Sequence, residues 1–177
     1  GIAYYDIIAK WADQNYLKTL IQEYWFLTDD ILQDGIYYPL EGYLAPETYF
    51  LTQETTNIES ITKMMLDQTE KHLEKYKKQL QSFQIGQKTL TIHEMMTLAS
   101  IIELEAGKAD DRKGVAGVFY NRLNNGWSLG SDVTTYYAEK IDNWTRDLRT
   151  SELNSCNAYN TRSSCMAGKL PVSPICN

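Results

Sequence analysis

Apolar side chains recur every three or four positions over most of this chain, which is the spacing of one face of a helix. The pattern predicts helices over residues 2–33 and 57–83, and a third that runs from a capping box at 91–94 to Gly107. A fourth helix is expected from 110 to near Gly126, and a short one near 134–140. The chain is therefore expected to be rich in helices.

Residues 35–50 interrupt this pattern. They contain two prolines, two glycines and five aromatic side chains, which exclude a regular helix and predict an ordered, aromatic-lined loop or a short strand pair. These segments together predict an α+β fold, a helix-rich domain with small irregular β elements and long ordered loops. We expect residues 1–56 to form a helical lead-in with the aromatic loop. Residues 57–177 would form the core, packed with the lead-in as one unit.

The charge of the chain narrows its range of partners. It carries 23 acidic and 17 basic side chains, for a net charge of −6. No run of lysines and arginines is long enough to follow a phosphate backbone, so a nucleic-acid partner is not expected. The 13 tyrosines and four tryptophans could stack on sugar faces or simply fill a core, and composition leaves that choice open.

The three cysteines, Cys156, Cys165 and Cys176, lie within the last 22 positions. Their spacing allows either a Cys156–Cys165 disulfide or free thiols, and it lacks the close pairs typical of zinc ligation, so no metal site is expected. No stretch is apolar enough to span a bilayer, and no signal peptide is visible. Because neither end resembles a natural terminus, we expect the chain to be a fragment of a larger protein.

The strongest signal for chemistry is a pair of carboxylates in the apolar segment 98–105 (LASIIELE). The helical neighbours of Glu103, three and four positions away, are all small, which leaves a hollow for a ligand. Glu105 instead neighbours two isoleucines and Lys108, which indicates a structural carboxylate. Apolar surroundings raise the pKa of a carboxyl, as a general acid for glycoside cleavage requires. Glu103 is therefore the candidate acid, although its position alone fits a surface glutamate equally well.

A glycosidase that uses water needs a second carboxylate across the scissile bond. The available residues are Glu41, Asp110 and Asp132. Further polar groups that could face a ligand are Asn121, Arg122, Asp132 and Thr134. The Ser-Asp-x-Thr sequence at 131–134 fits the N-cap of the short helix equally well. Segment 158–161 (AYNT) by itself predicts only a turn.

Other chemistries find little support in the sequence. It has no glycine-rich phosphate loop, no GxSxG elbow and no His-Glu-x-x-His pair. The two histidines, His72 and His93, lie in no pattern that would pair either with a cysteine nucleophile.

Taken together, six ordered blocks of this sequence resemble the YceG-like endolytic murein transglycosylases. The blocks are 40–49 (LEGYLAPETY), 98–105 (LASIIELE), 115–123 (VAGVFYNRL), 129–134 (LGSDVT), 158–161 (AYNT) and 168–175 (GKLPVSPI). Region 1–33 fits more loosely. Members of this family usually add a membrane helix, a LysM-like segment and a further C-terminal stretch, which agrees with the fragment interpretation. Cys156 and Cys165 match no family feature that we recognise.

The resemblance implies an enzyme that cleaves the β-1,4 bond between N-acetylmuramic acid and N-acetylglucosamine within glycan strands. Glu103 would protonate the glycosidic oxygen and then act as base while the C6 hydroxyl of muramic acid closes a 1,6-anhydro ring. This route needs no cofactor, no water and no second carboxylate. The residues expected to line the glycan cleft are Glu41, Ser100, Asn121, Arg122, Asp132, Thr134, Tyr159 and Asn160.

The resemblance also implies where the protein acts. Its partners would be peptidoglycan strands and peptidoglycan synthases, and a single membrane segment would anchor the parent protein with these residues on the extracytoplasmic face. Two alternatives stay open: a non-catalytic glycan-binding or scaffold module of cell-wall synthesis, and a pyridoxal-phosphate-dependent aminodeoxychorismate lyase. The lyase would need a Schiff-base lysine and a phosphate cup, and no lysine here stands out for that role.

Overall fold

The computed structural model describes residues 2–176 of the chain. The α-helices are α1 (Tyr4–Ala12), α2 (Gln14–Glu23), α3 (Ile58–Glu74), α4 (Lys77–Leu80), α5 (Ile92–Glu105), α6 (Arg112–Asn124), α7 (Asp132–Ala138) and α8 (Thr150–Leu153). The 3₁₀ helices are η1 (Asp29–Leu32), η2 (Ala109–Asp111) and η3 (Ser164–Met166). An antiparallel hairpin pairs β1 (Gln84–Ile85) with β2 (Lys88–Thr89). The predicted helix-rich α+β class is confirmed.

The prediction of one continuous helix over residues 2–33 is wrong. The chain folds there as α1, α2 and η1 in succession. Asp13 separates the first two, because its carboxylate accepts the backbone N–H groups of Asn15 at 2.8 Å and Tyr16 at 3.3 Å and so caps the start of α2. The apolar periodicity continues across this break, which is why the pattern alone did not reveal it.

The helix predicted over residues 57–83 also ends early. Helix α3 stops at Glu74, and the short α4 and the hairpin follow it. Gly86 lies in the hairpin turn with φ +59°, a left-handed conformation that favours glycine. The expected capping box of α5 is confirmed, since Thr91 and Glu94 each accept the other's backbone N–H.

Two clusters of buried apolar side chains stabilise the fold. The N-terminal cluster consists of Leu17, Leu20, Tyr24, Phe26, Leu27, Ile31, Leu40, Tyr43 and Leu66. The C-terminal cluster consists of Ile85, Leu90, Leu98, Ile101, Phe119, Leu129, Ala138, Tyr159 and Ile175. Helix α5 serves both, because Ile92 and Met96 pack against the first cluster while Leu98 and Ile101 lie in the second. The predicted division at residues 56 and 57 stays a prediction.

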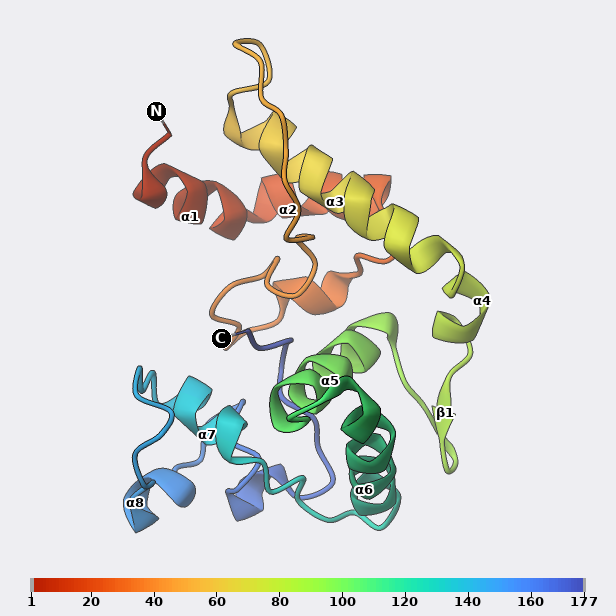
Figure 1. Cartoon of the computed structure of the whole chain (residues 1–177), viewed down its shortest axis with the longest axis vertical. Coiled ribbons are helices and arrows are strands. Elements are labelled where there is room, and N and C mark those ends of the chain that lie inside the picture. Colours follow the sequence, from red (N-terminus) through yellow and green to blue (C-terminus); the bar gives the residue numbers. More distant parts are fainter. Residues whose placement is uncertain (1, 177) are drawn as a thin grey trace.

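Residues 172–176, called here the C-terminal segment, lie between α1–α3 above and α5–α8 below in Figure 1. Side chains from distant parts of the chain hold it in place. His93 Nε2–H donates to the Val172 carbonyl at 2.8 Å, and Ser100 Oγ accepts the Ile175 N–H at 3.1 Å. Glu41 accepts the Cys176 N–H at 2.9 Å. The segment therefore connects the aromatic loop to α5.

Two further expectations from the sequence concern the cysteines and the membrane. Cys156 and Cys165 form a disulfide between α8 and η3, with their Cα atoms 6.0 Å apart, and Cys176 is a free thiol. Over residues 2–176, no helix combines the length and the apolar character that a bilayer span requires.

Candidate active site

Glu103 lies in the last turn of α5, at the wall of an open cavity. The cavity has a volume of about 520 Å³ and is lined mainly by small and apolar side chains from α5, the aromatic loop and the C-terminal segment. Ala99 and Ser100, one turn before Glu103, line the cavity with it. The side chain of Glu103 is 68% exposed. A carboxyl in this position can reach a ligand that enters the cavity.

The electrostatic setting of Glu103 differs from the expected one. Arg112, at the start of α6, places Nη2 3.0 Å from Glu103 Oε1. The sequence suggested a dry, apolar environment that would keep this carboxyl protonated. An exposed side chain beside a guanidinium is hydrated. Exclusion of water from Glu103 therefore has to come from a bound ligand.

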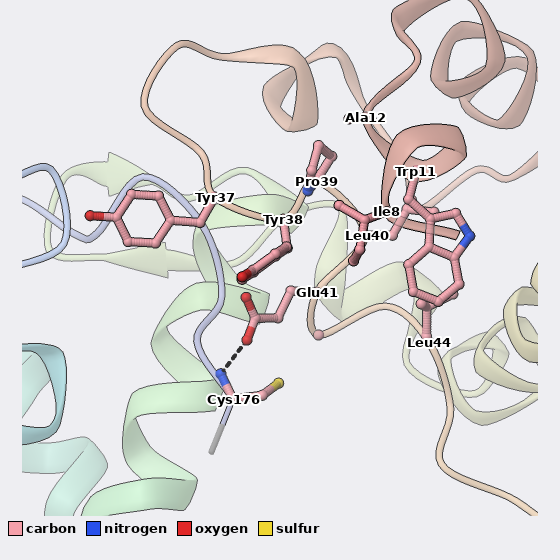
Figure 2. Close-up of a pocket in the computed structure, with 11 residues that line it drawn as sticks. Ile8, Trp11, Ala12, Tyr37, Tyr38, Pro39, Leu40, Glu41, Leu44 and Cys176 are labelled. Carbon is pink, nitrogen blue, oxygen red and sulfur yellow. Dashed lines mark hydrogen bonds between the residues drawn. The ribbon is translucent and has the colours of Figure 1, made fainter. Parts of the chain in front are cut away.

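Glu41 is the second carboxylate near this cavity, and it lines a neighbouring apolar pocket of about 310 Å³ together with Trp11, Tyr38 and Leu44 (Figure 2). Burial raises the pKa of Glu41, and this effect outweighs the hydrogen bonds that the carboxylate accepts from the Tyr137 hydroxyl and the Cys176 N–H. Both of its oxygens are thus used to hold other parts of the protein. Glu41 shapes the site by anchoring Cys176.

Cys176 borders both the Glu103 cavity and the apolar pocket. Although the residue is exposed, burial of the thiol, followed by the influence of the Glu41 carboxylate, raises the pKa of Cys176 to about 11. Gly42 borders both hollows as well. They are therefore adjacent parts of one groove.

Gly42 accounts for the close contact between sequence blocks 40–49 and 168–175. Its φ is +82°, and a Cβ at this position would lie 2.5 Å from Cβ of Pro174. Glycine is therefore required here on both conformational and steric grounds. The contact fixes the Glu-Gly-Tyr loop against the C-terminal segment and sets the shape of the groove next to Glu103.

Two predicted cleft residues are close to the groove or exposed, but each already has a partner. Ser100 lines the Glu103 cavity, while its hydroxyl donates to the Thr97 carbonyl and accepts the Ile175 N–H. Asp132 is the first residue of α7, exposed, with its carboxylate 3.4 Å from Nε of Arg162. The N-cap of α7 is Ser131, so the capping role considered for Asp132 is wrong.

The residues predicted on α6 separate into two roles. Asn121 is exposed on the helix surface. Arg122 donates from Nη1 to the Leu129 carbonyl and packs against Gly130, so it holds the loop that leads into α7. The guanidinium supports this loop, and the expected role of Arg122 as a ligand contact stays a prediction.

Three other predicted cleft residues, Thr134, Tyr159 and Asn160, are fully buried. Thr134 Oγ1 donates to the Ser131 carbonyl at 2.7 Å, and the Tyr159 hydroxyl lies 2.7 Å from Ser173 Oγ. Asn160 accepts the Thr135 hydroxyl at 2.7 Å and donates to backbone carbonyls of residues 152–155. Their burial excludes direct contact with a glycan, and they instead fix the loops around α7.

Sequence reasoning missed Arg112, the closest charged neighbour of Glu103. The sequence does contain an indication of this contact. A turn at Gly107 between two predicted helices brings the start of the second helix next to the end of the first. Among residues 2–176, no cluster of three or more His, Cys, Asp or Glu side chains is arranged to hold a metal ion.

The whole chain, residues 1–177, matches the model of the YceG-like family. The chain belongs to the YceG-like family. It is 38% identical over 133 residues to an endolytic murein transglycosylase of Bacillus subtilis, and 39% identical over 134 residues to one of Streptococcus pneumoniae; each alignment covers 75% of this chain. A crystal structure of a YceG-like protein from Listeria monocytogenes superposes with a TM-score of 0.82 at 32% identity over 98% of this chain.

This YceG-like chain corresponds to only part of its relatives. It covers 36% of the Bacillus protein, 23% of the Streptococcus protein and 53% of the Listeria chain. The family and the fold are thus shown for the region in which Glu103 lies.

Proposed function

We propose that this chain carries the catalytic centre of an endolytic peptidoglycan lytic transglycosylase, with Glu103 as general acid and then general base. The observation that carries the proposal is the placement of Glu103. It is an accessible carboxylate at the wall of a cavity of about 520 Å³, in a family whose curated relatives are named endolytic murein transglycosylases.

The substrate would be the β-1,4 bond between N-acetylmuramic acid and N-acetylglucosamine within a strand. Glu103 donates its proton to the bridging oxygen while the bond from that oxygen to C1 of muramic acid breaks. The C6 hydroxyl of the same sugar then attacks C1 and gives its proton to the Glu103 carboxylate, which closes the 1,6-anhydro ring and restores the acid. Water is not consumed, so a second carboxylate nucleophile is not needed.

A bound strand and Arg112 would act on different halves of this cycle. A strand that covers the cavity excludes water from the carboxyl, and exclusion of water favours its protonated form. After the first proton transfer the carboxylate is charged, and Arg112, whose Nη2 lies 3.0 Å from Glu103 Oε1, stabilises that charge.

The test is the Glu103→Gln variant of the full-length protein, incubated with isolated sacculi. Glutamine keeps the size and hydrogen-bonding shape of the side chain but cannot donate the proton. We expect loss of anhydro-muropeptides by at least about 100-fold, measured by mass spectrometry. Circular dichroism would verify that the variant is folded.

Glu105→Gln is the matched control on the same helix. Glu105 accepts the Ser131 hydroxyl at 2.5 Å, and a glutamine can still accept it, so product formation should persist. Undiminished anhydro ends from Glu103→Gln would refute the assignment. Wild-type products with reducing ends would show that water replaces the C6 hydroxyl and would refute the transglycosylase chemistry.

We also propose that the parent protein acts on the extracytoplasmic face of the membrane, anchored by a single segment, where it meets glycan strands and the synthases that make them. This proposal follows from the location of the substrate. Protease treatment of intact spheroplasts should degrade this region of the protein, and protection from the protease would contradict it.

A further inference from the structure

A third hollow, of about 320 Å³, adjoins the groove. We call it the aromatic pocket, and its walls include Tyr37, Tyr38, Tyr136, Tyr137, Trp144 and Lys140. Tyr37 and Tyr38 also line the apolar pocket, and Cys176 lines all three hollows. Figure 2 shows the Tyr38 ring next to the Glu41 carboxylate, which accepts the Cys176 N–H, while the Tyr37 ring points the other way. The aromatic pocket is therefore placed to hold a part of a polymer whose other part lies over Glu103.

The rings of the aromatic pocket are fixed by contacts with one another and with residues outside it. Tyr136 and Trp144 are stacked, with centroids 5.9 Å apart and ring planes 14° apart. The Tyr37 hydroxyl donates to the Ala138 carbonyl at 3.0 Å, and the Tyr137 hydroxyl donates to Glu41. Pre-positioned aromatic faces suit flat, weakly hydrated surfaces such as the C–H face of a sugar ring.

Lys140 gives the aromatic pocket its charge. It follows the C-cap of α7 with φ +52°, and it is the non-glycine residue with positive φ among residues 2–176. Glycine or asparagine is favoured in this conformation, and other residues are strained there by about 1 kcal/mol. The Lys140 ammonium lies 4.4 Å from the centroid of the Tyr37 ring. Within the described residues it forms no ion pair, so the charge is available to a ligand.

We propose that the aromatic pocket is a second binding subsite that takes a carboxylate-bearing sugar unit of a glycan strand. The sugar ring packs on the aromatic side chains, and Lys140 pairs with the carboxylate. In peptidoglycan this group is either the lactyl carboxylate of an unsubstituted muramic acid or a carboxylate of its peptide stem. Asp142, at the same rim, can accept hydrogen bonds from sugar hydroxyls. The inference rests on the proposed function for the identity of the polymer.

The experiment measures binding alone, so it does not depend on catalysis. Full-length protein carrying Glu103→Gln is titrated calorimetrically with strands that bear peptide stems, with amidase-stripped strands, and with chitooligosaccharides, which have the same linkage but no carboxylate. The same titrations are then repeated with the Lys140→Gly substitution introduced into this variant. Glycine adopts φ +52° without strain, so this variant keeps the backbone and should not lose stability. Lys78→Ala is the control, because Lys78 is exposed on α4, far from α7 in Figure 1.

We expect Lys140→Gly to weaken binding of at least one carboxylated strand about fivefold at low salt and to leave chitooligosaccharide binding unchanged. Weakening confined to stripped strands assigns the lactyl carboxylate, and weakening confined to peptide-bearing strands assigns the stem. Trp144→Ala should weaken binding of all three ligands. Lys78→Ala should change none.

The proposal is overturned if Lys140→Gly binds both carboxylated strands with unchanged affinity, or if it loses the same factor for chitooligosaccharides. It is also overturned if Trp144→Ala binds all ligands like its parent, or if the parent binds no strand. Failure of the proposed function looks different. Wild-type protein would then form no anhydro ends, while the Lys140-dependent difference in binding persisted.

Discussion

Asn160 shows how a polar side chain inside a family motif can serve the fold rather than a ligand. It is fully buried, and its amide accepts two hydrogen bonds, from the Thr135 hydroxyl and the Arg162 N–H, and donates three to the loop before it. In the sequence, a buried asparagine of this kind is indistinguishable from one that faces a groove. The same holds for Thr134 and Tyr159, which is why all three were expected in the cleft.

The role of Asn160 can be tested by Asn160→Ala. The substitution leaves several buried carbonyls and the Thr135 hydroxyl without their partner, so the free energy of unfolding should fall by about 2–4 kcal/mol in urea denaturation. Asn121→Ala on the exposed surface of α6 is the control and should change it by less than about 0.5 kcal/mol. Equal effects of the two substitutions would contradict the structural role.

At the same scale, the sequence located Glu103 correctly on a helix with small neighbours, and the cavity beside Ala99 and Ser100 bears out the expected hollow. Its catalytic role remains a prediction. The sequence did not reveal Arg112 or the exposure of the carboxyl, because both depend on how α6 folds back against α5.

At the scale of elements, the sequence predicted the start of α5 correctly and the ends of α1 and α3 wrongly. The capping box at Thr91 and Glu94 fixed the start of α5, because its hydrogen bonds involve residues three positions apart. The ends of α1 and α3 were missed. Apolar periodicity continues past both of them, and it conceals the break that the Asp13 cap makes between α1 and α2.

The loop between α8 and η3 is the element most dependent on a covalent constraint. It carries Tyr159 and Asn160 and is closed by the Cys156–Cys165 disulfide over a sequence separation of nine. Closing a loop of this size lowers the entropy of the unfolded chain and stabilises the fold by about 2–3 kcal/mol. The double variant Cys156→Ser with Cys165→Ser should lose that amount in urea denaturation.

The matched comparison for the disulfide is wild-type protein with and without a reductant. Reduction should lower the free energy of unfolding of the wild type and leave that of the double variant unchanged. Cys176→Ser should behave like the wild type in both conditions, since Cys176 forms no disulfide. Insensitivity of the wild type to reductant would show that the bridge does not stabilise the loop.

At the scale of the whole molecule, His93 joins three distant regions. It is 3% exposed, accepts the Tyr43 hydroxyl at Nδ1 (2.7 Å) and donates to the Val172 carbonyl. Burial lowers the pKa of His93 below its ordinary value of 6.5, although the hydrogen bond to the Val172 carbonyl and the charges of Asp30 and Glu94 oppose the shift. The folded protein thus binds this proton less tightly than the unfolded chain does.

Stability should therefore fall as the pH drops below about 6.5, because protons then favour the unfolded state. The contribution of this one group is at most about 1.4 kcal/mol per pH unit. Urea denaturation between pH 8 and 5 should show a shallower pH dependence for His93→Gln than for the wild type. Glu41, whose pKa burial raises, contributes with the opposite sign in both proteins and cancels in the comparison.

His72→Gln provides the control, because His72 is exposed on α3. This substitution removes a histidine without disturbing the buried contacts of His93. Identical slopes for His93→Gln and the wild type would show that this histidine does not link folding to protonation.

The C-terminal segment has a consequence for biosynthesis. A ribosome releases residues in order, and residues 172–176 emerge after the side chains that hold them, which include Glu41, His93, Ser100 and Tyr159. The helix that bears Glu103 can form early, but the wall shared by the three hollows is complete only after Cys176 has been synthesised. A nascent chain that stalls before this point would expose Glu103 without a groove to seat a polymer.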